Sequence, residues 1–210
     1  NEVTEFRPGE RVLAIPSSGC GQCEFCRVGR PEMCSQRKVL GVGTVNGAMA
    51  DFAAVPAASL VRIPDAVSDI QATMVEPLTV AYHAFRRRPA QVMEDVALVG
   101  CGTIGLLLLQ ILRQSGARRI FVSDILEDKL ERARRFGATH TVNPAKTDAV
   151  AAILQETAGR GVDLSFEAVG FEETVQTAMA ATRLGGDVVV VGNITKMGQI
   201  HMQGLVTREQ

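Results

Sequence analysis

The 210-residue sequence lacks several features that mark common classes of protein. It has no excess of charge: 22 basic and 23 acidic residues leave a net charge of −1, which gives no electrostatic reason to expect nucleic acid or an anionic membrane as partner. Its longest apolar run, Ile104 to Leu112, is broken by Gly105 and Gln110 and is too short to span a bilayer. No signal pattern follows Asn1. We therefore expect a cytoplasmic protein, and the 46% of apolar residues is enough to build one large or two modest domains.

Four of the five cysteines lie close together in the pattern C-x2-C-x2-C-x7-C, as Cys20, Cys23, Cys26 and Cys34. This spacing is poor for two disulfides, because neighbouring cysteines would compete for the same short loop. It suits four thiolates that converge on one tetrahedral metal, and the glycines and proline around them allow tight turns. Zinc is the expected ion, because four sulfurs with no open position match a structural zinc site.

Three other interpretations of the cysteine cluster remain open. An iron–sulfur cluster also uses C-x2-C-x2-C, but its fourth cysteine normally follows after three residues and precedes a proline, whereas here the gap is seven and Ser35 follows. A disulfide pair would suit a secreted protein. A nucleic-acid zinc ribbon would use the flanking basic residues, but aromatic stacking residues are lacking nearby. Those basic residues are Arg27, Arg30, Arg37 and Lys38.

The first part of the chain reads as short strands and loops around the cysteine lobe. Strands are predicted at 11–15, 49–55 and 59–63, with Pro56 and Pro64 as breaks. A capping box at Ser68 to Gln71 starts helical sequence, and a helix is predicted from Pro77 to about Arg88.

From residue 92 onward, short apolar strands alternate with helices. This order predicts a parallel sheet covered on both faces, which is a doubly wound α/β domain. Its predicted strands are 96–99, 119–123, 139–142, 162–169 and 187–191, and its predicted helices are 103–114, 126–136, 147–157 and 172–183.

A glycine-rich turn, G-x-G-x-x-G, follows the first of these strands and opens the first helix. Gly100 would make the tight turn, Gly102 would let the backbone approach a pyrophosphate, and Gly105 would let helix and strand pack closely. Thr103 and Ile104 complete the turn, so that the pyrophosphate meets the helix N-terminus. Cys101 is expected there for its small size, without a ligand role.

Asp124 follows the next strand, where the dinucleotide-binding fingerprint has an acid. Its carboxylate would accept hydrogen bonds from the adenosine ribose and repel an additional phosphate, which favours NAD over NADP. Asp124 and Glu127 could instead form only a helix cap, and both roles can coexist.

Taken in order, these motifs resemble the zinc-dependent medium-chain dehydrogenases of the alcohol dehydrogenase superfamily, and most of all their sorbitol, polyol and threonine dehydrogenase branch. The likeness extends over essentially the whole chain. The residues that carry it are Cys20 to Cys26 with Cys34, Val75-Glu76-Pro77-Leu78, Gly100 to Gly105, Asp124 with Lys129, Val162-Asp163, Glu167-Ala168-Val169-Gly170 and Val191-Gly192.

The resemblance implies a role for each matching residue. Cys20, Cys23, Cys26 and Cys34 match the structural zinc ligands, and Glu76 matches a position that supplies a catalytic-zinc ligand directly or through water. From the residues alone, Glu76 is an acid favoured by the dipole at a helix start. Asp124 and Lys129 match the ribose-binding pair. The positions that match the adenine and nicotinamide pockets are Val169, Gly170, Val191 and Gly192.

The resemblance also implies that this chain is a fragment. The family's cysteine and Gly-His-Glu catalytic ligands would precede Asn1. His83 is expected to be a packed helix residue, His140 and His201 fall on strand-like segments, and none of the three completes an obvious triad. We expect part of a β-rich GroES-like catalytic domain at residues 1–88 and an NAD-binding Rossmann domain at 89–210. The implied full-length enzyme is a homodimer or homotetramer that transfers hydride from a secondary alcohol or polyol to NAD, giving a ketone or aldehyde.

The sequence leaves two other functions open. The chain could be a non-catalytic module that binds NAD and zinc as a sensor or interaction domain. It could also be related to the zinc-free quinone reductases, although the four-cysteine lobe disfavours that relationship.

Overall fold

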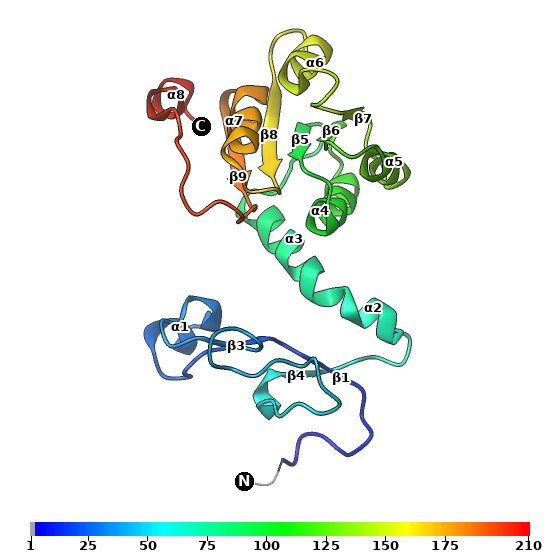
Figure 1. Cartoon of the computed structure of the whole chain (residues 1–210), viewed down its shortest axis with the longest axis vertical. Coiled ribbons are helices and arrows are strands. Elements are labelled where there is room, and N and C mark those ends of the chain that lie inside the picture. The colour runs from blue at the N-terminus through cyan, green and yellow to red at the C-terminus, as the bar shows by residue number, and fades with distance from the viewer. Residues whose placement is uncertain (1–2) are drawn as a thin grey trace. The chain divides into compact units, whose positions relative to one another are not determined.

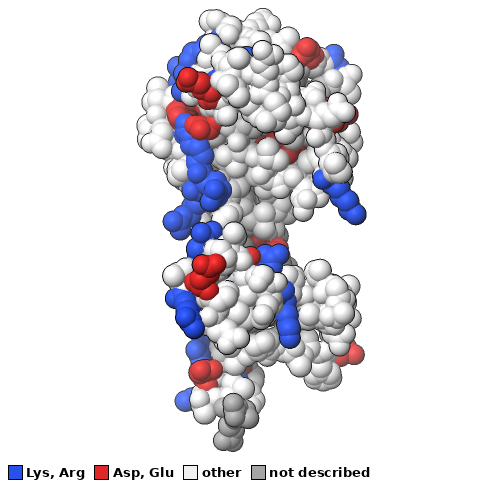
Figure 2. Space-filling model, turned by 90° about the vertical axis from the view of Figure 1, so that its left-hand side faces the viewer, with Lys and Arg blue, Asp and Glu red and all other residues white. Residues whose placement is uncertain are grey.

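The computed structural model describes residues 3–210, and the chain divides into two compact units, Asn1–Glu76 and Pro77–Gln210 (Figure 1). Helix α3 (Val75–Arg87) begins in the first unit and ends in the second. The predicted boundary between domains at residue 88 stays a prediction. None of the helices formed by residues 3–210 is long and apolar enough to cross a membrane. On the face shown in Figure 2, basic and acidic side chains lie near one another, in keeping with the balanced net charge.

The first unit consists of short strands and turns. Strands β1 and β4 pair antiparallel, as do β2 and β3. Ser68 forms the predicted capping box with Gln71 at the start of α2. The elements of this unit are β1 (Val12–Ala14), β2 (Ser17–Ser18), α1 (Glu24–Arg27), the 3-10 helix η1 (Pro31–Met33), β3 (Lys38–Val39), the 3-10 helix η2 (Ala57–Ser59), β4 (Leu60–Arg62) and α2 (Asp69–Thr73).

The strand predicted at residues 49–55 is wrong. This segment forms an open loop, in which Met49 and Phe52 are almost completely exposed (93% for Phe52). A strand needs a neighbour to hydrogen-bond its backbone. Among the described residues, β1 and β4 pair only with each other, so this segment has no strand partner.

The second unit is the predicted doubly wound α/β domain. Its five strands are all parallel, in the order β7-β6-β5-β8-β9. Most elements lie close to their predicted positions. They are β5 (Asp95–Val99), α4 (Thr103–Gln114), β6 (Arg119–Ser123), α5 (Glu127–Arg135), β7 (His140–Val142), α6 (Ala149–Glu156), β8 (Val162–Glu167), α7 (Glu172–Ala181), β9 (Thr182–Val190) and α8 (Met202–Arg208).

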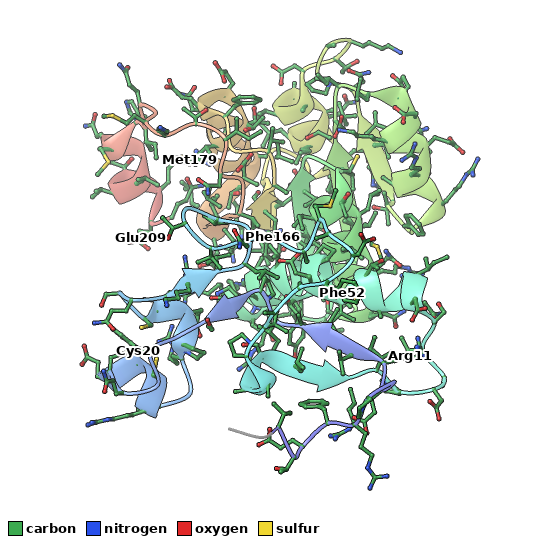
Figure 3. The ribbon with its side chains drawn as sticks, turned by 60° about the horizontal axis from the view of Figure 1, so that its bottom comes forward. Arg11, Cys20, Phe52, Phe166, Met179 and Glu209 are labelled. Atoms are coloured by element: carbon green, nitrogen blue, oxygen red, sulfur yellow. The ribbon has the colours of Figure 1, made fainter. Side chains whose placement is uncertain are left out.

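The sheet has apolar side chains on both faces, as its strand sequences predict. Alternate residues of one strand enter different cores: Leu98 packs with α3, α4 and α5, whereas Ala97 packs with Ile153 of α6 and Ala181 of α7. Phe166 of β8 belongs to the larger core and is fully buried (Figure 3). The arrangement leaves the carboxyl ends of the strands and their loops for binding.

Two predictions near the C-terminus need correction. The helix predicted at 172–183 ends at Ala181, and Thr182 already begins β9, because its buried hydroxyl hydrogen-bonds to Ser165 of the neighbouring strand (2.6 Å). His201, expected on a strand, is instead the N-cap of α8, where Nδ1 accepts a hydrogen bond from the Gly204 amide (3.0 Å).

A buried carboxylate at the amino end of the central strand β5 makes the second unit sensitive to acid. Asp95 receives two hydrogen bonds each from Arg118 and Arg119, at 2.5–3.0 Å. Burial alone would raise the pKa of Asp95, but these arginines lower it to about 2. A lowered pKa in the folded state stabilises the fold above the unfolded pKa, and that stability is lost as pH falls through the folded pKa.

We therefore expect the melting temperature of the second unit to fall between about pH 4 and pH 2 as Asp95 is protonated. D95N should lower the free energy of unfolding at pH 7 by about 2 kcal/mol and flatten this acid dependence. Thermal unfolding followed by circular dichroism at several pH values measures both effects. If the melting temperature of D95N depends on acid as strongly as that of the wild type, other carboxylates cause the acid dependence.

Candidate functional site

The four clustered cysteines converge in the first unit. Their Sγ atoms all lie within 4.8 Å of one another. Cys20 lies before α1 (Figure 3), Cys23 is the N-cap of α1, Cys26 is within α1, and Cys34 follows η1. Among residues 3–210, these side chains form the only group of three or more potential metal ligands.

Local backbone geometry builds this cluster. The amide of Cys20 donates a hydrogen bond to Sγ of Cys34 (3.4 Å), and the amide of Cys26 donates to Sγ of Cys23 (3.5 Å). Gly21 adopts φ 78°, which favours glycine. A Cβ at Gly19 would collide with Sγ of Cys26. Gly19 and Gly21, on either side of Cys20, are therefore needed to bring the sulfurs together.

The donor set fits a single zinc ion. Four sulfurs at about 2.3 Å from a tetrahedral zinc are about 3.8 Å apart, which is within the observed limit. A cubane iron–sulfur cluster would separate the sulfurs more widely, because it occupies the space between them. None of the five cysteines forms a disulfide in this structure, so the geometry gives no support to the paired-disulfide interpretation.

The thiols of the cluster differ in acidity before any cation is considered. Hydrogen bonds from the backbone of Gln22 and Cys23 lower the pKa of Cys20 to about 6. Burial raises the pKa of Cys26 to about 11. A bound cation would be needed to hold four thiolates together at neutral pH.

Glu76 does not belong to this cluster. It is an exposed residue in the first turn of α3, where the helix dipole favours an acid. His83, expected to be packed, is exposed on α3, because the buried face of that helix is formed by Ala81 and Ala84. The role of Glu76 as a catalytic-zinc ligand stays a prediction.

The second unit has a cavity of about 350 Å³ at the carboxyl ends of its central strands. Val99 of β5 lies between Ser123 of β6 and Glu167 of β8 in the sheet, so the loops after these strands meet there. Five predicted cofactor residues line the cavity, namely Gly100, Gly102, Asp124, Lys129 and Val169.

The three glycines of the loop occupy different environments. Gly100 has φ 93°, and a Cβ there would collide with Cγ2 of Val169. A Cβ at Gly105 would collide with the carbonyl oxygen of Gly100. At Gly102 there is no atom within 4 Å of the position of a Cβ, and no side chain caps α4, which begins at the next residue. The space beside Gly102 and the helix N-terminus could therefore receive a phosphate group.

Asp124 holds the glycine loop and the following turn together. Its Oδ2 accepts a hydrogen bond from the Cys101 amide (3.0 Å), and its Oδ1 accepts one from the Leu126 amide (3.0 Å). Lys129 Nζ lies 3.7 Å from Oδ2. The alternative that Asp124 is simply the helix cap is wrong, since the N-cap of α5 is Leu126 and no side chain caps that end.

Cys101, in the glycine loop, is completely buried. Burial raises the pKa of its thiol to about 12. Its expected lack of a ligand role stays a prediction.

The other predicted cofactor residues lie behind or beside the cavity lining. Ile104 and Val191 pack against the larger core, and a Cβ at Gly192 would collide with the backbone of Gly170. Thr103 begins α4. Sequence reasoning missed several lining residues, because they come from loops and from the start of α7, which carry no recognisable motif. These are Ile125, Leu126, Pro144, Phe171, Thr174 and Ile194.

Comparisons with known proteins agree with this arrangement. Residues 103–210 match the family described as zinc-binding dehydrogenase, and residues 1–65 match the alcohol dehydrogenase GroES-like domain. Sorbitol dehydrogenase of Bacillus subtilis (strain 168) is 34% identical over 192 residues, and L-idonate 5-dehydrogenase of Vitis vinifera is 36% identical over 196 residues. Each alignment covers 91% of this chain and 54% of the relative.

Solved structures give the same result. A protein of Sinorhizobium meliloti 1021, assigned as a zinc-binding dehydrogenase and solved bound to NADP, is 30% identical with a TM-score of 0.90. The match covers 99% of this chain and 61% of that one. The chain spans about half the length of the curated relatives it matches. From its motifs, its two sites and these matches, the chain belongs to the zinc-dependent medium-chain alcohol dehydrogenase family.

Proposed function

We propose that this chain provides the dinucleotide-binding unit and the structural zinc lobe of an oxidoreductase. The full-length protein would transfer hydride from a secondary alcohol or polyol to NAD and release a ketone or aldehyde. The observation that carries this proposal is the cavity beside Gly102, which is open at the glycine loop and has the Asp124 carboxylate in its lining. A homodimeric or homotetrameric full-length form in the cytoplasm stays a prediction.

Each part of the cavity suits one part of a dinucleotide. Backbone amides at the start of α4 would bind the pyrophosphate, because the helix N-terminus carries partial positive charge. Asp124 and Lys129 would bind the adenosine ribose. Val169, with Gly170, Val191 and Gly192 behind it, would shape the pocket that keeps water from the nicotinamide.

Two zinc sites are proposed for the full-length protein. Cys20, Cys23, Cys26 and Cys34 would hold a structural ion, as their converging sulfurs support. Glu76 would contribute to a second, catalytic site whose other ligands come from outside this chain. Zinc at such a site supplies Lewis-acid chemistry, lowering the pKa of a bound hydroxyl.

The Asp124 carboxylate supports a preference for NAD, since it would repel the 2′-phosphate of NADP. We expect D124N to reduce the ratio of the NADPH to the NADH dissociation constant by about tenfold or more, as one charged acceptor is worth about 1.5–3 kcal/mol and about 1.4 kcal/mol corresponds to tenfold. Fluorescence of the reduced nicotinamide measures both constants. Because the chain has no tryptophan, no tryptophan emission adds to this signal.

D128N is the matched control, because Asp128 is an exposed acid on α5 that pairs with Arg132 and does not line the cavity. It should leave the ratio within about twofold of wild type, given the small effect of exposed charges. If both variants change the ratio equally, cofactor preference depends on net charge rather than on Asp124.

The non-catalytic alternative is favoured for the isolated chain by one observation. Among residues 3–210, Glu76 belongs to no group of three or more potential ligands. The isolated chain should therefore bind NADH without oxidising alcohols. An assay of NADH formation with sorbitol, run beside the binding titration, tests this expectation. Sustained turnover by the 210 residues would show that this chain already contains every essential ligand.

A further inference from the structure

Glu167 is a buried acid whose role the sequence motif does not explain. It is the last residue of β8 and has 0% exposed surface. Its Oε2 is buried and has no hydrogen-bond partner among the described residues. An unsatisfied buried carboxylate oxygen is energetically costly, so the rest of the side chain must provide a compensating benefit.

The other oxygen of Glu167 accepts three hydrogen bonds, two from the turn that follows β8 and one from helix α7. Its Oε1 accepts hydrogen bonds from the amides of Val169 (2.8 Å) and Gly170 (2.7 Å). It also lies 2.7 Å from the hydroxyl of Thr174 on α7, which donates to it. One atom therefore fixes two successive backbone groups of the turn and links this turn to the helix.

This turn lies against the other two loops at the cavity. A Cβ at Gly100 of the glycine loop would collide with Cγ2 of Val169, and one at Gly192 would collide with the backbone of Gly170. The amides of Val191 and Gly192 also donate to the carbonyl oxygen of Glu167 (2.7 and 3.1 Å). Because these contacts leave no free space, a shift of the turn would displace the loops after β5 and β9.

We propose that Glu167 is a positioning residue for the dinucleotide. Its Oε1 holds the Val169–Gly170 turn in the position that the glycine loop needs to receive the cofactor. The carboxylate acts through this turn and does not touch the cofactor itself. This inference rests on the proposed function, because it assigns a role in dinucleotide binding.

Two substitutions separate the position of the acceptor oxygen from its charge. E167Q keeps an oxygen at the place of Oε1 and removes the charge, whereas E167D keeps the charge and withdraws the oxygen by one methylene. S165A is the matched control: Ser165 lies two residues earlier on β8, is equally buried, and hydrogen-bonds to Thr182 away from the cavity.

The experiment measures NADH dissociation constants of the 210-residue variants well below their melting temperatures, together with hydrogen–deuterium exchange of residues 168–171. We expect E167D to bind NADH about tenfold more weakly and to exchange faster in this turn, because a backbone donor is left unsatisfied. E167Q should stay within about threefold of wild type in affinity, because the three donors keep their acceptor. S165A should lose stability but keep its affinity.

Equal NADH affinity in E167D and wild type would overturn the inference, and so would an equal loss in E167D and S165A. If E167D does not fold, T174V replaces it, with an expected loss of about threefold from the missing hydroxyl. Failure of the wild-type chain to bind NADH would instead reject the proposed function. The exchange data would still show, in that case, whether Glu167 holds the turn.

Discussion

Replacing Gly102 by alanine is expected to weaken NADH binding by about a hundredfold while leaving the melting temperature unchanged. The added methyl group would meet no protein atom within 4 Å, so the fold has room for it. It would occupy the space through which a pyrophosphate approaches the start of α4, and two charge-assisted hydrogen bonds would be lost. A fluorescence titration with NADH and a thermal melt measure the two quantities.

Gly105 provides the contrasting variant within the same loop. A Cβ at Gly105 would collide with the Gly100 carbonyl oxygen, so G105A should lower the melting temperature as well as the affinity. G102A and G105A thus distinguish a glycine that is needed for NADH binding from a glycine that is needed for stability. If G102A binds NADH as tightly as wild type, the pyrophosphate does not lie beside Gly102.

Removal of the proposed structural zinc is expected to unfold the cysteine lobe while the second unit keeps its fold. Structural zinc in small sites contributes about 10–16 kcal/mol, which two-stranded sheets as short as β2 and β3 cannot replace. A strong chelator should therefore expose the segment around residues 20–34 to proteases before it affects the second unit. Limited proteolysis with mass spectrometry identifies the first cleavage sites.

C34S removes one thiolate and should reduce the zinc content from about one ion per chain to near zero. C101A is its control, because Cys101 is a buried cysteine of the second unit and belongs to no ligand cluster. The C101A variant should keep its zinc even if it is less stable than the wild type. If chelation leaves both the proteolysis pattern and the melting curve unchanged, a metal does not hold the lobe together.

The sequence predicted the second unit well because its signals are local. Strands buried on both faces are apolar throughout, as in Val96 to Val99, and the glycine loop follows directly from such a strand. The four cysteines likewise lie close enough in sequence for their convergence to be inferred. Family resemblance added what spacing could not, above all the interpretation of Glu76.

Features that depend on distant partners escaped prediction. The segment 49–55 has the composition of a strand, but no described strand pairs with it. Thr182 leaves its predicted helix because Ser165, far away in sequence, provides a hydrogen bond in the sheet. Glu167 is one of the residues that carry the family resemblance, but the sequence assigned no role to it. The three hydrogen-bond donors around its Oε1 suggest a role.

Titration of the zinc-loaded chain with NADH tests the proposal that this chain is the dinucleotide-binding part of a zinc-dependent dehydrogenase. We expect saturable binding of about one NADH per chain, since the second unit has one glycine-loop cavity with Gly102 and Asp124 in its lining. NADPH should bind more weakly. The absence of saturable binding of either nucleotide by the folded, zinc-loaded chain would contradict the proposed dinucleotide-binding role.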